Sequence, residues 1–187
     1  TSKLNQLIAS KRVNYILNQL DYYGYCGDQP RGLVFCSRQA EAKELAVRFN
    51  AANHPAIALT NQSSSQERAK AVEQLEAGKI EYIITVDLFN EGVDIPSVNQ
   101  IVMMRNTQSP IVFTQQLGRG LRQYPGKDFV TVIDFIGNYQ HNYMIPLALN
   151  QDNSRSKDRA RREVKVPMNF DVSTINFTKV AEEQILA

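Results

Sequence analysis

Five short apolar segments are spaced along residues 32–135, and this spacing constrains the fold more than any other feature of the sequence. Each segment has the length and composition of a β-strand; they are residues 32–37, 56–60, 81–86, 99–104 and 129–135. Residues 38–50 and 66–79, which separate the first three segments, have the pattern of helices. Apolar strands that alternate with helices favour a mostly parallel sheet covered on both faces. The sequence therefore predicts an α/β domain whose functional loops lie at the carboxyl ends of the strands.

Helix boundaries and domain organisation follow from capping and turn-forming residues. Residues 4–23 have apolar residues at helical spacing and end at a run of turn formers, which predicts an N-terminal helix. Ser37 is predicted to cap the next helix, and Ser65 with Arg68 is predicted to open the one after it. A last short helix is predicted from residue 173. We therefore expect an N-terminal helix and loop, a central α/β domain, and a partly helical C-terminal extension or linker, with bounds 1–30, 31–136 and 137–187.

The composition narrows the class of protein. The net charge of +2 neither requires nor excludes nucleic acid, and no apolar window is long enough to span a membrane. Cys26 and Cys36 form no C-x-x-C pair, and His54 and His141 have no ligand partners at metal spacing, so no metal site is predicted. Both cysteines are expected to be free thiols, with Cys36 in the core. The sequence does not begin with Met, and we expect it to be a piece of a longer chain.

The segment "QQLGRGLR" combines two arginines and two glycines. If residues 110–123 form a helix, Gln115, Arg119 and Arg122 lie at positions i, i+4 and i+7 and share one face. Two guanidinium groups on one face suit a triphosphate, because they can neutralise charge on a transferring phosphoryl group. Each glycine weakens a helix by about 1 kcal/mol relative to alanine, which favours close approach of another group to the backbone. From the spacing alone, a solvated helix face remains the alternative.

The segment "TVDLFNEGVDIP" follows the third predicted strand directly. Gly92 permits a ligand to approach the backbone, and Asp94 can accept a hydrogen bond from a hydroxyl group such as that of a ribose. In the alternative interpretation, Asp94 and Pro96 build a turn and Asp87 caps a short helix. This segment by itself does not decide between the two.

Four segments, in this order and at these separations, look like motifs IV, V and VI of superfamily 2 helicases: "GLVFCSRQAEAKELA", "LTNQSSSQER", "YIITVDLFNEGVDIPSVNQIVMMRNTQS" and "QQLGRGLR". The Q-x-x-G-R-x-x-R pattern of motif VI is matched by Gln115, Gly118, Arg119 and Arg122. Over residues 11–136 the chain resembles the second, C-terminal RecA-like domain of bacterial DEAD/DEAH-box helicases related to type III restriction subunits. Residues 154–185 look like the continuation found in a branch that also carries an N-terminal phospholipase D-like domain.

The resemblance implies a role for each matched residue. Arg122 corresponds to the family's arginine finger and Arg119 to its companion, both directed at the γ-phosphate of ATP. Gln115 corresponds to the amide that couples the nucleotide to the domain interface, and Gly92 with Asp94 to the motif that contacts the ribose and senses closure. ATP and Mg²⁺ are expected to be held mainly by a preceding RecA-like domain, since this chain has no G-x-x-x-x-G-K-[ST] loop and no D-E-x-[DH] motif. Alone, the chain is expected not to hydrolyse ATP.

The resemblance also implies a nucleic-acid interface at the strand ends. The residues expected to contact the nucleic-acid backbone are Ser37, Arg38, Thr60, Asn61 and Thr85. Thr85 departs from the family pattern: it lies seven residues before Gly92, whereas the family threonine lies six before, a place that Val86 occupies. The basic run at 154–165 is either a solvated linker or a further nucleic-acid contact.

Together these features predict the C-terminal motor domain of an ATP-dependent superfamily 2 helicase or translocase, a hydrolase that acts on nucleic acid, with DNA as the expected substrate. Two alternatives stay open. One is an RNA helicase of the same superfamily, and the other is a catalytically inactive pseudo-motor that binds nucleic acid or a partner protein. No membrane partner is expected, and the predicted location is the cytoplasm.

Overall fold

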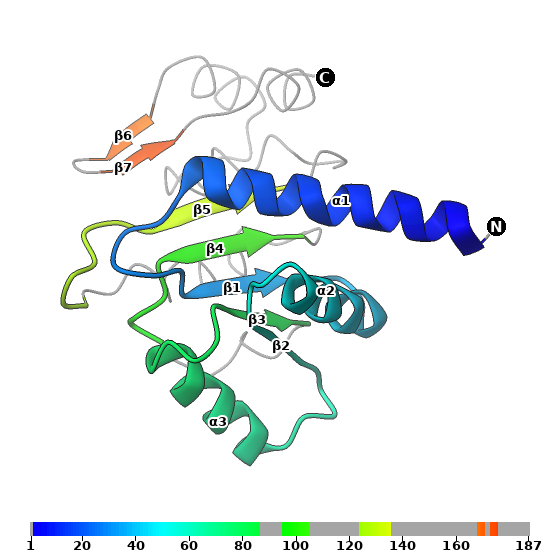
Figure 1. Ribbon diagram of the computed structural model, residues 1–187. Helices are drawn as coiled ribbons and strands as arrows, with labels where there is room; N and C mark the ends of the chain where they lie inside the picture. Colours follow the sequence, from blue (N-terminus) through cyan, green and yellow to red (C-terminus); the bar gives the residue numbers. More distant parts are fainter. Residues whose placement is uncertain (1, 87–94, 105–123, 136–167, 171–172, 176–187) are drawn as a thin grey trace, which may run out of the picture.

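The computed structural model describes residues 2–86, 95–104, 124–135, 168–170 and 173–175. Its centre is a parallel sheet with the strand order β2-β3-β1-β4-β5 (Figure 1). In chain order these strands are β1 (Gly32–Phe35), β2 (Ala56–Leu59), β3 (Tyr82–Thr85), β4 (Gln100–Met103) and β5 (Thr131–Asp134). Each of the five predicted strands is confirmed, and each is somewhat shorter than the apolar segment that predicted it.

Helices cover both faces of the sheet. α1 (Ser2–Tyr23) and α2 (Gln39–Ala51) bury apolar side chains against one face, and α3 (Ser65–Glu76) packs on the other. Because successive side chains of a strand point to opposite faces, Val34 of β1 faces α1 and α2, whereas Leu33 and Phe35 face α3. Figure 1 shows α1 running alongside β4 and β5, in the direction opposite to the strands. The predicted three-layer α/β arrangement is therefore confirmed.

The strands end at the same level, so their carboxyl ends lie together at one end of the sheet. The register pairs Phe35 with Thr85 on one side and with Met103 on the other, and it pairs Leu59 with Thr85. From β1 the chain moves to β2 at one side of the sheet, whereas from β4 it moves to β5 at the other side. The boundary between β1 and β4 is thus a topological switch point, where open α/β sheets bind ligands beyond the strand ends.

A side chain occupies the outer edge of β2. The Asn50 amide donates to the carbonyl of Ala56 (Nδ2–O 2.7 Å) and accepts from the Ala56 N–H (N–Oδ1 3.1 Å). The same Nδ2 donates to the carbonyl of Ala46 in α2 at 2.7 Å. Asn50 therefore pairs with β2 as a neighbouring strand would, and it fixes the end of α2 to that edge.

Two predicted helix caps are wrong by one residue. α2 has Arg38 at its N-cap with no side-chain capping bond, so Ser37 is not the cap; the N–H of Ser37 instead lies 3.4 Å from Glu41 Oε2. α3 is capped by Ser64 and not by Ser65. Before α3, three adjacent serines, Ser63 to Ser65, could each act as the cap, and in both loops the spacing of apolar residues fixes a helix end only to within one or two positions.

A short antiparallel pair lies in the C-terminal extension, formed by β6 (Met168–Phe170) and β7 (Ser173–Ile175). The helix predicted from residue 173 therefore does not begin there. The β-branched pair Thr174 and Ile175 favours an extended backbone, which the capping signal at Ser173 did not outweigh. The rest of the predicted extension lies outside the described residues.

A buried hydrogen-bond network ties α1 to the amino end of the sheet. Tyr82 Oη donates to Gln100 Oε1 (2.8 Å), and Gln100 Nε2 donates to the carbonyls of Gly24 (2.8 Å) and Leu20 (3.2 Å). Tyr82 and Gln100 both pair in register with Gly32, which lies between them in the central strand. A Cβ at Gly32 would lie 2.3 Å from Tyr82 Cδ1, so only glycine leaves room for the ring.

Asn99 makes a second set of buried contacts next to this network. Its Oδ1 accepts from the Arg31 N–H (2.7 Å), and its Nδ2 donates to the carbonyls of Cys26 (2.7 Å) and Gln29 (2.8 Å). The loop between α1 and β1 is thereby fixed to the start of β4. Neither this amide nor that of Gln100 could be recognised from the sequence as a buried contact, because a polar pair at the start of an apolar segment resembles an ordinary loop.

The substitution Gly32→Ala is expected to lower the free energy of unfolding by about 1–3 kcal/mol, because the added methyl group overlaps the Tyr82 ring and displaces it from Gln100. Urea denaturation of the chain measures the change. In a Tyr82→Val background, which lacks the ring, the same substitution should cost much less. An equal cost in both backgrounds would show that the ring contact is not the cause.

Candidate functional site

Exposed polar side chains lie at the carboxyl edge of the sheet. Ser37 and Arg38 follow β1 after the buried Cys36, and Asn61 follows β2; all three of these polar residues are exposed. The structure thus places them at strand ends, as predicted. Because β3 lies between β1 and β2, the two loops flank the end of β3. A hydroxyl, a guanidinium and an amide are presented to solvent along one edge.

A side-chain hydrogen bond joins these two loops. Gln39 Nε2, at the start of α2, donates to Asn61 Oδ1 at 2.6 Å. The bond fixes the orientation of the Asn61 amide and leaves its Nδ2 group as the available donor. Gln39 was not predicted from the sequence as part of this site, because only the order of the strands in the sheet reveals that its loop and that of Asn61 meet.

Thr60 supports the turn after β2 and is itself buried. Its N–H donates to Ser63 Oγ (3.0 Å), its Oγ1 accepts from the Gln62 N–H (3.3 Å), and its carbonyl accepts from the Ser63 N–H (2.9 Å). Only 3% of Thr60 is exposed. Its observed contacts are therefore those of a turn-forming residue, and contact with a nucleic acid stays a prediction.

Thr85 ends β3 and is fully buried. It is 0% exposed and lies in register between Phe35 and Leu59. Its hydroxyl finds no hydrogen-bond partner among the residues that the structure describes. Contact between Thr85 and a nucleic acid would require this side chain to become exposed, so that role also stays a prediction.

Charged and ionisable groups near Ser37 limit the chemistry of this edge. Glu41 lies beside the Ser37 N–H and forms an ion pair with Arg12 (Nη2–Oε1 2.6 Å), which partly offsets its negative charge. The neighbouring Cys36 is buried, and its burial raises the pKa of the thiol to about 12. Cys36 is therefore protonated at neutral pH and is no nucleophile, in agreement with its predicted place in the core.

The loop after β2 ends in a reciprocal cap of α3. Ser64 Oγ accepts from the Glu67 N–H (3.2 Å), and Glu67 Oε2 accepts from the Ser64 N–H (2.7 Å). The hydrogen bond from the Ser64 backbone lowers the pKa of the Glu67 carboxyl. This capping box fixes the direction in which the chain leaves Asn61.

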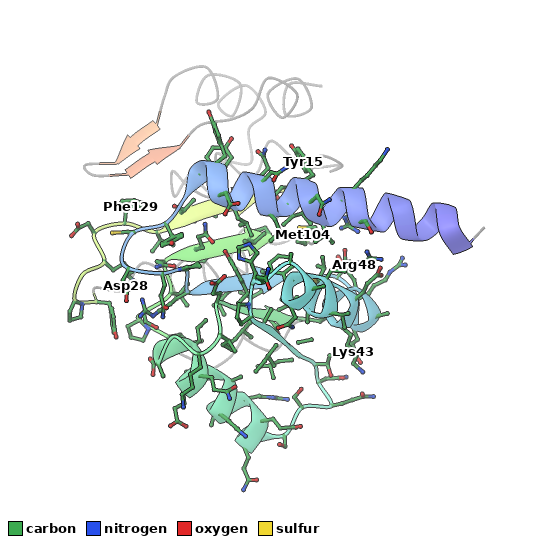
Figure 2. The ribbon with its side chains drawn as sticks, in the orientation of Figure 1. Tyr15, Asp28, Lys43, Arg48, Met104 and Phe129 are labelled. Carbon is green, nitrogen blue, oxygen red and sulfur yellow. The ribbon has the colours of Figure 1, made fainter. Side chains whose placement is uncertain are left out.

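The predicted nucleotide-contacting residues lie outside the described residues; they are Gly92, Asp94, Gln115, Arg119 and Arg122. The structure describes the chain on both sides of them. Gly92 and Asp94 precede Ile95. The other three lie between Met104, at the carboxyl end of β4 (Figure 2), and Tyr124.

The described residues include neither a metal-binding cluster nor a membrane-spanning helix. No group of three or more His, Cys, Asp or Glu side chains in this part of the chain could hold a metal ion. Among the helices that the structure describes, none combines the length and the apolar character that crossing a membrane requires.

The sequence matches known proteins over a range that includes β1 to β4. The family model described as "Helicase conserved C-terminal domain" matches residues 12–123, which is more than half of the chain. IRC3 of Saccharomyces cerevisiae, which bears the name of an ATP-dependent helicase, is 34% identical over 79 residues, covering 42% of this chain and 12% of that protein. The ATP-dependent RNA helicase drs1 of Neosartorya fischeri is 29% identical over 112 residues, covering 60% of this chain and 13% of that protein. The chain thus spans only a small part of these relatives.

Solved structures share the fold. The C-terminal domain of the DEAD-box protein Dbp5 superimposes with a TM-score of 0.57 at 18% identity, covering 81% of this chain and 89% of that one. At this identity the likeness shows the arrangement of the elements and nothing more specific.

The capping box gives a prediction with a control one residue away. Ser64→Ala is expected to lower the free energy of unfolding by about 1 kcal/mol, because the Glu67 N–H loses its acceptor. Ser65→Ala, at an exposed residue within the first turn, should change it by less than about 0.5 kcal/mol. Urea denaturation of both variants decides, and a larger loss for Ser65→Ala would contradict the observed cap.

Proposed function

The chain belongs to the helicase conserved C-terminal domain family, and from this premise we propose that it is the C-terminal motor domain of an ATP-dependent superfamily 2 helicase or translocase. Its parallel sheet with helices on both faces is the RecA-like fold of such domains. The match over residues 12–123 carries the proposal, because this range holds both the exposed strand-end loops and the "QQLGRGLR" segment.

The topology supports a place for that segment next to the switch point. Parallel strands of one sheet are joined almost always by right-handed crossovers. In agreement with this rule, the connections that contain α2 and α3 run in opposite directions along the sheet and lie on opposite faces. The connection from β4 to β5 moves across the sheet in the same direction as the connection that contains α3. We therefore expect it to cross on the α3 face, starting from Met104 at the switch point.

The proposed chemistry is phosphoryl transfer to water, with the charge of the transition state stabilised by this domain. Arg122 and Arg119 are assigned to the γ-phosphate, where planar guanidinium groups neutralise charge that develops as the phosphoryl group leaves. Gln115 is assigned to coupling between nucleotide and domain interface, and Gly92 with Asp94 to the ribose. A preceding RecA-like domain of the full-length protein is proposed to hold ATP and Mg²⁺.

The exposed edge is proposed to grip a nucleic-acid backbone. Ser37, Arg38 and Asn61 supply a hydroxyl, a guanidinium and an amide, which are the groups that commonly bind phosphate oxygens. The Gln39–Asn61 bond keeps the two loops together, so that they would move as one unit. Closure of the two motor domains on ATP would then shift the grip by a step, and hydrolysis would release it.

DNA is the proposed nucleic acid, and RNA is the second candidate because one relative bears the name of an RNA helicase. Because residues 11–136 and 154–185 resemble this branch, we propose that the chain belongs to the helicases related to type III restriction subunits that carry an N-terminal phospholipase D-like domain. A cytoplasmic location fits these roles. The pseudo-motor alternative differs from all of these in lacking turnover.

Replacement of Arg122 by alanine in the full-length protein is expected to lower kcat for ATP by about 10³- to 10⁵-fold, because the transition state loses its arginine finger. Binding of a fluorescent ATP analogue should remain close to that of the wild type. Arg48→Ala is the matched control, since Arg48 (Figure 2) lies on α2, where it pairs with Glu44 and donates to Ser10 Oγ of α1. Near-normal turnover of Arg122→Ala would refute the assignment, and absence of turnover in the wild type would favour the pseudo-motor.

Replacement of Arg38 by alanine is expected to weaken binding to single-stranded DNA and to reduce the slope of log K against log salt by about one, because one phosphate contact is lost. Fluorescence anisotropy at several salt concentrations measures both quantities, with Arg48→Ala again as the control. A parallel titration with single-stranded RNA compares the two substrates. An unchanged slope in Arg38→Ala would remove Arg38 from the interface.

A further inference from the structure

The first turn of α2 contacts both exposed loops at the carboxyl end of the sheet. Gln39 donates to Asn61 in the loop after β2, and Glu41 Oε2 lies 3.4 Å from the N–H of Ser37 in the loop after β1. Arg38 lies between these two contacts and is the N-cap of the helix, with no side-chain capping bond. The Ser37 N–H thus finds an acceptor in a side chain of the helix that follows it.

Arg12 of α1 holds the same carboxylate through its other oxygen. Arg12 Nη2 donates to Glu41 Oε1 at 2.6 Å, so each oxygen of the carboxylate has a partner. The Glu41 side chain is only 19% exposed, whereas that of Arg12 is 53% exposed. Because the carboxylate is largely shielded from solvent, salt screens this pair less than a fully exposed one. The pair therefore restricts the carboxylate to the place where it accepts from Ser37.

Both partners of this ion pair extend from tightly packed backbone. Arg12 is followed by Val13 and Glu41 by Ala42, and both of these apolar residues are buried in the core cluster of α1, α2 and the sheet. Arg48 of α2 also donates to a hydroxyl group of α1 (Nη1–Oγ 2.8 Å), which joins the two helices a second time. Loss of the contact between Arg12 and Glu41 should therefore leave the helices packed and act on the loop after β1.

The charges of both residues are felt at the end of β1. Burial is the main cause that raises the pKa of the Cys36 thiol; the Glu41 charge raises this pKa further, and the Arg12 charge lowers it. An unpaired carboxylate at this place would repel a phosphate group, because like charges repel each other. Arg12 thus has two effects on this strand end, since it fixes the carboxylate and offsets its charge.

We infer that Glu41 and Arg12 are positioning residues of the nucleic-acid grip, an inference that rests on the proposed function. Glu41 sets the direction of the loop that carries Ser37 and Arg38, and Arg12 acts on this loop through Glu41. The inference is carried by the double contact of one carboxylate, to α1 through Oε1 and to the loop after β1 through Oε2. Charge alone predicts the opposite for Glu41, since loss of a carboxylate beside a polyanion should strengthen binding.

The sign of the change at Glu41 tests the inference in the full-length protein. Glu41→Ala is expected to weaken binding to single-stranded DNA about 3- to 10-fold, measured by fluorescence anisotropy, because the loop loses its fixed orientation. Glu41→Gln keeps an oxygen that can accept from the Ser37 N–H, so its affinity should lie between those of the wild type and Glu41→Ala. Binding by Glu41→Ala that equals or exceeds that of the wild type would overturn the inference.

Glu44→Ala is the matched control for a loss of stability. It removes the ion pair between Glu44 and Arg48 from the same helix, and it should change the affinity by less than about twofold. If Glu44→Ala weakens binding as much as Glu41→Ala, loss of an ion pair on α2 explains both effects and the inference is overturned.

A double-mutant cycle tests whether Arg12 acts through Glu41. Arg12→Met alone is expected to weaken binding about 3- to 5-fold, but in the Glu41→Ala background it should change the affinity by less than about twofold. The slope of log K against log salt should stay that of the wild type in Arg12→Met, whereas Arg38→Ala lowers it by about one. Additive losses, or a slope lowered by about one in Arg12→Met, would show that Arg12 binds phosphate itself and would overturn its assignment.

Failure of the proposed function can be told apart from failure of this inference. If the wild type binds DNA and Arg38→Ala weakens that binding while Glu41→Ala does not, only the inference fails. If the wild type binds neither single-stranded DNA nor RNA, the proposed grip fails and hydrogen exchange becomes the readout of positioning. A peptide of residues 36–40 should then exchange faster in Glu41→Ala and Arg12→Met than in Glu44→Ala. Equal exchange in the three variants would show that the carboxylate does not position this loop.

Discussion

The hydrogen bond from the buried Tyr82 hydroxyl to Gln100 crosses the central strand at Gly32, and the neighbouring elements take their positions from it. Gln100 also donates to the carbonyls of Leu20 and Gly24 at the end of α1, and these bonds fix that helix relative to the sheet. A buried amide left without partners costs roughly 1–3 kcal/mol, so the network also disfavours other registers of the three central strands. With the register fixed at the amino end, the carboxyl ends of those strands are level.

The two ends of the sheet have different roles. At the amino end, the side chains of Asn99, Gln100 and Lys127 are bound to backbone carbonyls, and loops far apart in the sequence are joined. At the carboxyl end, Ser37, Arg38 and Asn61 face solvent. A rigid scaffold that presents exposed groups on short loops is the usual arrangement in α/β domains that bind ligands.

The strands could be predicted because each is an apolar run of strand length, and the strand-end position of Ser37, Arg38 and Asn61 followed from it. The hydrogen-bond partners of the side chains could not be predicted from the sequence. Gln39 and Asn61 are 22 residues apart, and only the strand order brings them together. A position at a strand end also does not reveal whether a side chain faces solvent or the interior. Thr60 and Thr85 were expected to be accessible at strand ends, but both are buried. The cap of α3 depends on a choice among adjacent serines, and that of α2 on a helix start one residue later than the sequence indicated.

Asn50 makes the two sides of the sheet unequal as surfaces for association. Its amide satisfies the N–H and carbonyl of Ala56 that an incoming strand would otherwise use, so Asn50 hinders strand addition at this position of β2. On the β5 side, the described part of the chain includes no strand beyond β5. A second polypeptide that added a strand beside β2 would have to displace the Asn50 amide from Ala56.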